Sequence, residues 1–198
     1  MLRELRPALV LLVILTLVTG VLFPFAVTGV AKIFFPTQAA GSLIEQDGKI
    51  VGSALIGQNF SDPKYFHGRP SATTAADPND PDKSVAAPYN AANSGGANLG
   101  PTSKALSDRV AEEVKAQGVE GTAQIPVDLV TTSASGLDPD ITPAAAEFQV
   151  PRVAKARNLP EQAVRDLVIR NTAERTVGIL GERRVNVLAL NLALDHSH

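Results

Sequence analysis

The sequence predicts an α+β protein, with one N-terminal transmembrane helix followed by a small antiparallel sheet packed with helices. Three observations lead to this fold class: a long uncharged segment opens the chain, an Asp-Gly pair separates two apolar runs, and amphipathic helical segments fill much of the remainder. We expect residues 1–7 to be a short cytoplasmic N-terminus, 8–35 to be the membrane helix, and 36–198 to be one extracytoplasmic soluble domain.

The uncharged segment, Ala8 to Ala31, is long enough to cross a bilayer. At about 1.5 Å per residue, a helix of this length spans roughly 36 Å, against about 30 Å of hydrocarbon. A cleaved signal peptide is the alternative, because Arg3 and Arg6 precede the segment and the small residues 39–41 follow it. The apolar core of a signal peptide is only about 7–15 residues long, so the length favours an uncleaved anchor.

Two features of this segment bear on how it packs in the membrane. Pro24 lies inside it, and a proline removes one backbone donor and tends to kink a helix. Gly20 and Gly29 lie on either side of Pro24, and small residues allow another transmembrane helix to approach closely.

Arg3 and Arg6 precede the segment and Lys32 follows it, so the bias of basic residues predicts a cytoplasmic N-terminus.

After the membrane segment, Asp47-Gly48 separates the runs 41–46 and 49–57. Both residues tolerate positive φ, so we expect a hairpin of two antiparallel strands. Residues 59–72 are rich in aromatic side chains, which must pack on something. Thr73 to Gly100 then shows no periodic pattern and is predicted to be a long loop, a kind that is usually disordered, functional or pinned by a partner.

The rest of the chain is predicted to be mainly helical. Pro101–Gln117 repeats apolar residues every four positions, Thr142 and Pro143 begin a second helix that Pro151 interrupts, and Pro160–Asn171 forms a third. Alternating β-branched residues predict a strand over Ile125–Val130. The tail, Val185–Leu194, is predicted to be a short helix capped by Asn186, with a strand as the alternative.

Composition excludes several functions. The chain has no cysteine, which rules out disulfides and Cys-based zinc sites. Its net charge of −2 provides no basic surface for nucleic acid. Acidic residues outnumber basic ones two to one between Glu45 and Glu147, whereas basic residues predominate afterwards. An acidic surface concentrates cations, although ordinary solubility explains such a bias equally well.

Motifs for catalysis are scarce, and we assign no catalytic or metal-binding residue. His67 is the only histidine away from the C-terminus, and neither a His-x-x-x-His pair nor a Gly-x-Ser-x-Gly motif occurs. A membrane-anchored extracytoplasmic hydrolase or a binding module that uses His67 remains the alternative function. Gly95-Gly96 precedes a predicted helix, but the phosphate-binding pattern with its lysine is absent.

Four blocks of sequence resemble the C subunit of the Kdp potassium-transporting ATPase. They are Tyr65–Ala72, Asn93–Thr102, Ser135–Ala146 and Arg184–Asn191. Their order and spacing, together with the leading membrane helix, match the family over essentially the whole chain.

The resemblance implies an accessory, non-transporting subunit of an ATP-driven K⁺ import complex in the bacterial inner membrane. Its partners there are a channel-like K⁺-translocating subunit, a P-type ATPase subunit and a small single-helix subunit. The family is described as a catalytic chaperone that raises the ATP affinity of the ATPase subunit. A direct nucleotide contact has been proposed for the glycine-rich stretch, here Ser94, Gly95 and Gly96.

The basic-residue bias conflicts with a direct ATP contact, because P-type ATPases bind ATP in the cytoplasm. We therefore expect the domain to cap the side on which K⁺ enters, with ATP bound by the complex and K⁺ as the transported ion. The residues predicted to steer cations are Asp77, Asp80 and Asp82. The residues predicted to contact partners are Pro24, Tyr65, Phe66, His67, Arg69 and Asn98.

Overall fold

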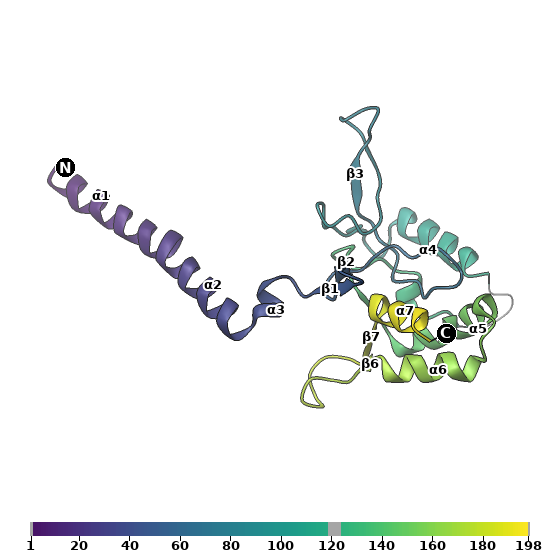
Figure 1. The fold of residues 1–198 in the computed structure, drawn as a ribbon. Coiled ribbons are helices and arrows are strands. Elements are labelled where there is room, and N and C mark those ends of the chain that lie inside the picture. Colours follow the sequence, from purple (N-terminus) through teal and green to yellow (C-terminus); the bar gives the residue numbers. More distant parts are fainter. Residues whose placement is uncertain (1, 119–123, 198) are drawn as a thin grey trace. The chain divides into compact units, whose positions relative to one another are not determined.

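A computed structural model describes residues 2–118 and 124–197, and it confirms the α+β class. The chain forms two compact units, Met1–Ser53 and Ala54–His198 (Figure 1). The first unit contains the apolar helix and one hairpin, and the second contains the remaining strands and helices.

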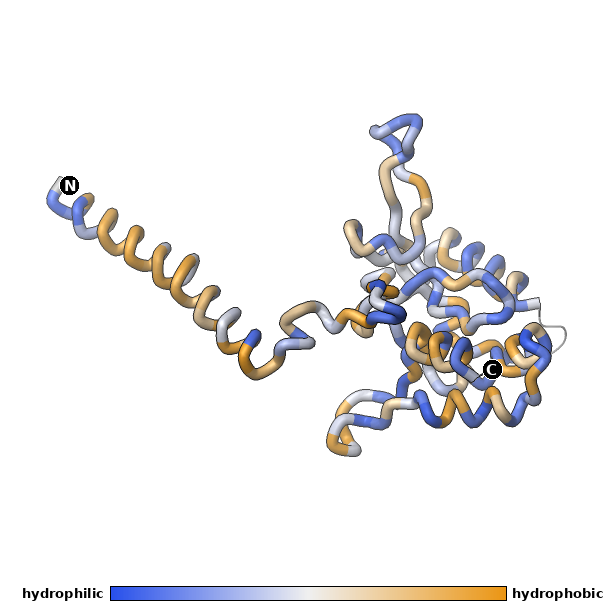
Figure 2. Tube along the Cα trace, viewed as in Figure 1, coloured by the Kyte–Doolittle hydropathy of each residue, from blue (hydrophilic) through white to orange (hydrophobic). Residues whose placement is uncertain are grey.

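The first unit begins with a continuous helical segment made of α1 (Leu2–Leu17), a π-helical turn (Val18–Leu22) and α2 (Phe23–Phe34). Its apolar stretch is not buried in the protein, and Figure 2 shows it as one hydrophobic run. By length and composition, this helix can cross a membrane.

The π-helical turn lies directly before Pro24. The Phe23 N–H donates to the carbonyl oxygen of Val18, five residues earlier, in place of the usual four. A proline ring clashes with the carbonyl four residues before it and offers no N–H of its own. The wider turn relieves that crowding, and π-bulges of this kind occur most often where a helix has a function.

A short helix, α3 (Pro36–Ala39), leads to the antiparallel strands β1 (Leu43–Gln46) and β2 (Lys49–Ser53). The turn residues Asp47 and Gly48 both have positive φ, at 51° and 74°. This confirms the predicted hairpin and its turn chemistry.

The second unit is organised around a small antiparallel sheet with strand order β5–β7–β6. Helices α5, α6 and α7 lie together beside it (Figure 1). The strands of the unit are β3 (Thr74–Ala76), β4 (Ser84–Ala86), β5 (Asp140–Ile141), β6 (Thr172–Ala173) and β7 (Arg184–Asn186). Its helices are α4 (Lys104–Ala116), the 3₁₀ turn Val127–Leu129, α5 (Pro143–Arg157), α6 (Glu161–Arg170) and α7 (Val187–Asp195).

The core of this unit is built by α5, α6, α7 and β7. Val164, Leu167 and Val168 lie on one face of α6 at helical spacing, and all three are buried. The predicted caps also form: the Thr142 hydroxyl accepts from the Ala145 N–H at 3.1 Å, and the Asn186 side chain accepts from the Ala189 N–H at 3.0 Å. The core residues contributed by α5, α6 and α7 include Ala146, Val150, Val153, Val164, Leu167, Leu190 and Leu194.

Three local predictions were wrong. Residues Thr73–Gly100 are not structureless, because β3 and β4 pair as an antiparallel hairpin that projects from the unit (Figure 1). Its strands consist mainly of small residues without an apolar alternation, so no pattern marked them. Ile125–Val130 is not a strand but contains the 3₁₀ turn, where Asp128 is buried and serves as a hydrogen-bond acceptor.

Pro151 does not interrupt the second predicted helix, since α5 runs through it. Pro151 is exposed, so the carbonyl that it leaves without a partner can be hydrated. The neighbouring Val150 and Val153 are fully buried, and their packing outweighs a proline penalty of about 3 kcal/mol.

Candidate functional site

Two buried amide side chains hold the segment that contains Phe66 and His67. Asn191 of α7 accepts from the Phe66 N–H at 2.8 Å and donates to the Phe66 carbonyl at 3.0 Å. Gln149 of α5 makes the same pair of bonds to His67, at 2.8 and 3.1 Å. Each amide satisfies two backbone groups, so this segment is fixed like a strand although it has no strand neighbour.

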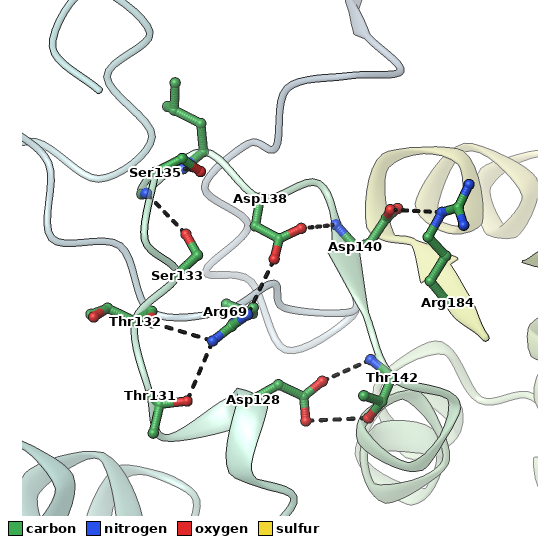
Figure 3. A network of polar contacts seen from close by, with 12 residues as sticks. Arg69, Asp128, Thr131, Thr132, Ser133, Ser135, Asp138, Asp140, Thr142 and Arg184 are labelled. Carbon is green, nitrogen blue, oxygen red and sulfur yellow. Dashed lines mark hydrogen bonds and ion pairs between the residues drawn. The ribbon is translucent and has the colours of Figure 1, made fainter. Parts of the chain in front are cut away.

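Arg69 is the centre of a polar network between this segment and the loop before β5 (Figure 3). Its guanidinium donates to the Asp138 carboxylate at 3.2 Å and to the carbonyl of Thr132 at 3.2 Å. Asp140, two residues on, forms an ion pair with Arg184 at 3.1 Å. Burial raises the pKa of Asp140, and the Arg184 charge opposes that rise.

Asp128 completes the network from the 3₁₀ turn (Figure 3). Its carboxylate accepts from the Thr142 N–H at 2.7 Å and from the Thr142 hydroxyl at 3.2 Å. The cap of α5 is therefore itself held by a buried carboxylate, which positions the start of the helix beside the Arg69 loop.

Tyr89 lies against this network with a positive φ of 60°. Its hydroxyl donates to the Arg69 carbonyl at 2.7 Å. A Cβ at Gly57 would collide with its ring and with the Asp138 carbonyl, and a Cβ at Gly68 would collide with its hydroxyl, so glycine suits both positions. Burial, followed by the Asp138 charge, raises the pKa of Tyr89 to about 12, and the hydroxyl therefore stays a donor.

The predicted partner-contact residues differ in whether the domain already holds their side chains. Phe66 is fully buried and Arg69 is paired within the domain, so both have structural contacts of their own. Tyr65 is packed between Phe60, at a ring-centroid distance of 5.4 Å, and the guanidinium of Arg157, at 4.9 Å. Asn98 is exposed and has a positive φ of 48°.

The His67 ring contacts the Asp62 carbonyl at 3.1 Å and the Arg152 guanidinium at 3.5 Å. Burial lowers the pKa of His67, and the Arg152 charge lowers it further. No hydrogen bond between this ring and a serine hydroxyl or a carboxylate occurs among residues 2–118 and 124–197. The hydrolase alternative gains no support from this geometry.

The glycine-rich stretch packs against the loop at Ser133–Gly136. The Gly95 N–H donates to the Ser135 carbonyl at 2.9 Å, and the Ser94 hydroxyl donates to the same oxygen at 3.0 Å. A Cβ at Gly96 would lie 2.7 Å from the Ala134 carbonyl. Close backbone packing thus accounts for Gly96 and for the Gly95 amide, while the nucleotide contact stays a prediction.

Asp77, Asp80 and Asp82 lie in the turn that joins β3 to β4, the hydrophilic tip in Figure 2. Asp80 pairs with Lys83 at 2.8 Å, and Asp77 accepts from the Asn79 N–H at 2.8 Å. Within the described part of the chain, no group of three potential metal ligands is found. The tip is therefore an acidic surface rather than a built cation site.

A pocket of about 730 Å³ opens between α4, α5 and the segment 59–72. Three arginines line it: Arg69, Arg109 and Arg152. Sequence reasoning missed Arg109 and Arg152, because isolated arginines on two helices give no motif. The three arginines are recognised as a group only in the structure, where they line the same pocket.

Comparison with known proteins gives one family over nearly the whole chain. Residues 5–196 match the family described as KdpC: K+-transporting ATPase, c chain. The chain belongs to the KdpC family. This confirms the resemblance seen in the four sequence blocks.

Full-length relatives of this KdpC family member agree with that assignment. A "Potassium-transporting ATPase KdpC subunit" of Bradyrhizobium diazoefficiens is 69% identical over 198 residues, covering 100% of this chain and 98% of the relative. A protein with the same description from Rhodopseudomonas palustris (strain BisB18) is 66% identical over 196 residues, covering 98% of each chain. One from Methylobacterium nodulans is 65% identical over the same length and the same shares.

Proposed function

We propose that this chain is the accessory, non-transporting subunit of an ATP-driven K⁺ import complex, anchored by one helix and stabilising the assembly. The observation that carries the proposal is the family match over residues 5–196, which includes both the helix and the domain. The domain offers a partner-binding scaffold, whereas the groups described around His67 lack a nucleophile.

The proposed partners are the channel-like K⁺-translocating subunit, the P-type ATPase subunit and the small single-helix subunit. The exposed apolar helix, with its π-helical turn before Pro24, supports a contact with another helix inside the bilayer. Purification of the tagged full chain from membranes should bring two larger membrane proteins with it. Recovery of the chain alone under mild detergent conditions would contradict the proposal.

We place the domain outside the cytoplasm, on the side from which K⁺ enters the inner membrane. Arg3 and Arg6 before the helix support this orientation, with Lys32 after it. Ser94→Cys tests it, because the residue is exposed and the chain has no other cysteine. A membrane-impermeant maleimide should label this variant in whole cells with a permeable outer membrane, and should leave Glu4→Cys unlabelled. The reverse pattern would exclude the capping role.

At that position the acidic hairpin tip would raise the local K⁺ concentration. Replacing Asp77, Asp80 and Asp82 by asparagine should weaken the apparent K⁺ affinity of the complex roughly two- to tenfold at low ionic strength. Raising the ionic strength with a choline salt should abolish the difference. A control that neutralises Glu45, Asp108 and Glu112 should keep the wild-type affinity, and an equal loss there would refute steering by the tip.

Support of the ATPase subunit is then indirect. We propose that the chain raises the ATP affinity of that subunit by stabilising its assembled form, and that ATP binds the complex elsewhere than on Ser94, Gly95 and Gly96. The backbone packing of this stretch supports an indirect role. Photoaffinity labelling of the purified complex with an azido-ATP should modify the ATPase subunit, and labelling of residues 93–102 would overturn the proposal.

A further inference from the structure

The pocket between α4 and α5 has the size and lining of a site for a small ligand. Its volume of about 730 Å³ lies within the usual range of small-molecule sites. Part of the lining is apolar, with Phe60, Leu129, Phe148 and Pro151, and part is cationic, with the three arginines. A ligand that matches both kinds of lining has an apolar part and a negative charge.

The positive charge of the pocket is poorly balanced by the domain. Of the three arginines, only Arg69 forms an ion pair among the described residues, with Asp138 at 3.2 Å. Within the described residues, Arg152 contacts no carboxylate: it donates to the carbonyls of Pro63 and Tyr65 and to the side chain of Gln149, and it lies 3.5 Å from the His67 ring nitrogen. Burial lowers the pKa of Arg152, as expected for a guanidinium without a counter-ion.

Two of the arginines that line the pocket also have an unsatisfied donor. The Nε atoms of Arg69 and Arg109 are both buried and make no hydrogen bond within the described part of the chain. An unsatisfied buried donor costs about 1–3 kcal/mol, more when it is charged, so proteins rarely retain one without a reason. The domain thus leaves the charge of these two guanidinium groups incompletely satisfied.

Glu113 is the only acidic residue among those that line the pocket. Burial raises its pKa, and the charge of Arg109, one helical turn earlier, opposes the rise. No ion pair within 4.0 Å joins these two side chains, so Glu113 offsets the charge of Arg109 only from a distance. A carboxylate in the lining also works against an anionic ligand.

The wall formed by α4 suits an exchangeable ligand. None of the side chains of this helix is buried, although its sequence is amphipathic. Arg109 also lines a second hollow of about 270 Å³, beside Gly96, Asn98 and Thr131. The guanidinium thus lies between two cavities, on a helix that the domain packs only lightly, and its movement costs little.

We propose that this pocket binds a small organic anion, with its phosphate or carboxylate group on Arg109 and Arg152, beside Arg69, and its apolar part against Phe60 and Phe148. An acidic side chain of a partner subunit is the other candidate occupant. A single aspartate or glutamate fills only a small part of a hollow of this volume, which favours a free ligand. This site is independent of the proposed place of the chain in the complex.

Calorimetric titration of the full chain in detergent tests the site, with phenyl phosphate and inorganic phosphate as probes at constant ionic strength. We expect saturable binding of both, with phenyl phosphate roughly tenfold tighter because its ring contacts the apolar residues of the lining. Arg109→Gln should weaken both probes about tenfold. Since no α4 side chain is buried, this variant should keep its fold, which circular dichroism checks.

Two further variants make the result specific. Glu113→Gln removes the acidic group of the pocket and should tighten the binding of both probes roughly two- to fivefold. Arg170→Gln removes the same charge from an exposed position at the end of α6, and should bind both probes as the wild type does.

Absence of saturable binding to the wild-type chain at millimolar probe would overturn the proposal. So would an equal loss in Arg170→Gln and Arg109→Gln, because that result would indicate binding by net charge. Unchanged probe affinity in Arg109→Gln, together with loss of complex assembly, would assign the pocket to an acidic side chain of a partner and equally overturn the proposal.

Discussion

Two sides of the second unit, Ala54–His198, differ sharply in how they are packed. Around residues 66–67, the amides of Asn191 and Gln149 are only 1% and 3% exposed, and every donor and acceptor that they present to the backbone is used. Across the pocket, α4 buries no side chain, and Arg109 keeps an unpaired donor. The side around residues 66–67 therefore uses its polar groups to hold the fold, whereas the α4 side keeps a donor that has no partner.

The difference changes how the sequence blocks are interpreted. Phe66 and Arg69 lie in a sequence block that resembles the family, and both make contacts within the domain itself. Groups with free capacity lie on α4 and on the β3–β4 tip, which carry no motif. In this domain, the strongest pattern marks the scaffold and the weakly packed edge offers the surfaces for ligands.

The largest effect is expected on the packed side. Asn191→Leu keeps the size of the side chain but leaves the buried N–H and carbonyl of Phe66 without partners. We expect a loss of about 2–5 kcal/mol in the free energy of unfolding. Urea titration of the full chain in detergent, followed by circular dichroism, measures it. Asn79→Ala at the exposed hairpin tip should change the value little, and a similar loss there would invalidate the comparison.

A pair of valines compares the two sides directly. Val150 of α5 is fully buried, so Val150→Ala should cost about 2 kcal/mol. Val110 of α4 is only partly buried, and Val110→Ala should cost less than about 1 kcal/mol. The same urea titrations measure both. Equal losses would mean that α4 is part of the core.

Adjacent glycines test the boundary between the two sides. A Cβ at Gly96 would lie 2.7 Å from the Ala134 carbonyl, whereas a Cβ at Gly95 would meet nothing within 4 Å. Gly96→Ala should therefore lose about 1–3 kcal/mol of stability, and Gly95→Ala less than about 0.5 kcal/mol. Thermal unfolding distinguishes the variants. Equal stability, with a shared loss of ATP-dependent function, would instead support a nucleotide contact.

The smallest effect is expected at Tyr89. Tyr89→Phe removes the hydrogen bond to the Arg69 carbonyl and should cost about 1 kcal/mol near neutral pH. Folding raises the pKa of Tyr89 from 10.0 to about 12, so the folded state holds this proton more tightly than the unfolded state does. The associated stability is present below pH 10 and is lost as the pH rises to about 12.

Unfolding curves of wild type and Tyr89→Phe between pH 8 and 12 measure that loss. The gap in stability between them should close above pH 10, because the variant lacks the titrating group. A constant gap for Tyr89→Phe would show that the hydroxyl is not buried as described.

Local chemistry made several elements predictable. The Asp47-Gly48 turn, the Thr142 and Asn186 caps and the buried face of α6 depend on residues within a few positions of one another. The uncharged segment likewise predicted a membrane-length helix without reference to the rest of the chain. Each of these features is determined by residues that lie close to it in the sequence.

Predictions failed where distant contacts decide the outcome. The helix through Pro151 persists because α6 and α7 bury its neighbours, and the 3₁₀ turn at Asp128 places a buried carboxylate that holds Thr142, the cap of α5. The amphipathic repeat of Pro101–Gln117 predicted a helix, and α4 is one, but the repeat could not show that its apolar face would be only partly buried.

By itself, the sequence determined the membrane-length anchor, the fold class, the family and most helix boundaries, because each depends on composition or short-range spacing. Only the tertiary structure decided which motif residues are consumed in the scaffold, and that Arg69, Arg109 and Arg152 face one hollow. The three arginines are 40 and 43 positions apart along the chain. No local pattern relates residues at such separations, and only the packing of α4 and α5 beside the segment 59–72 brings them to one pocket.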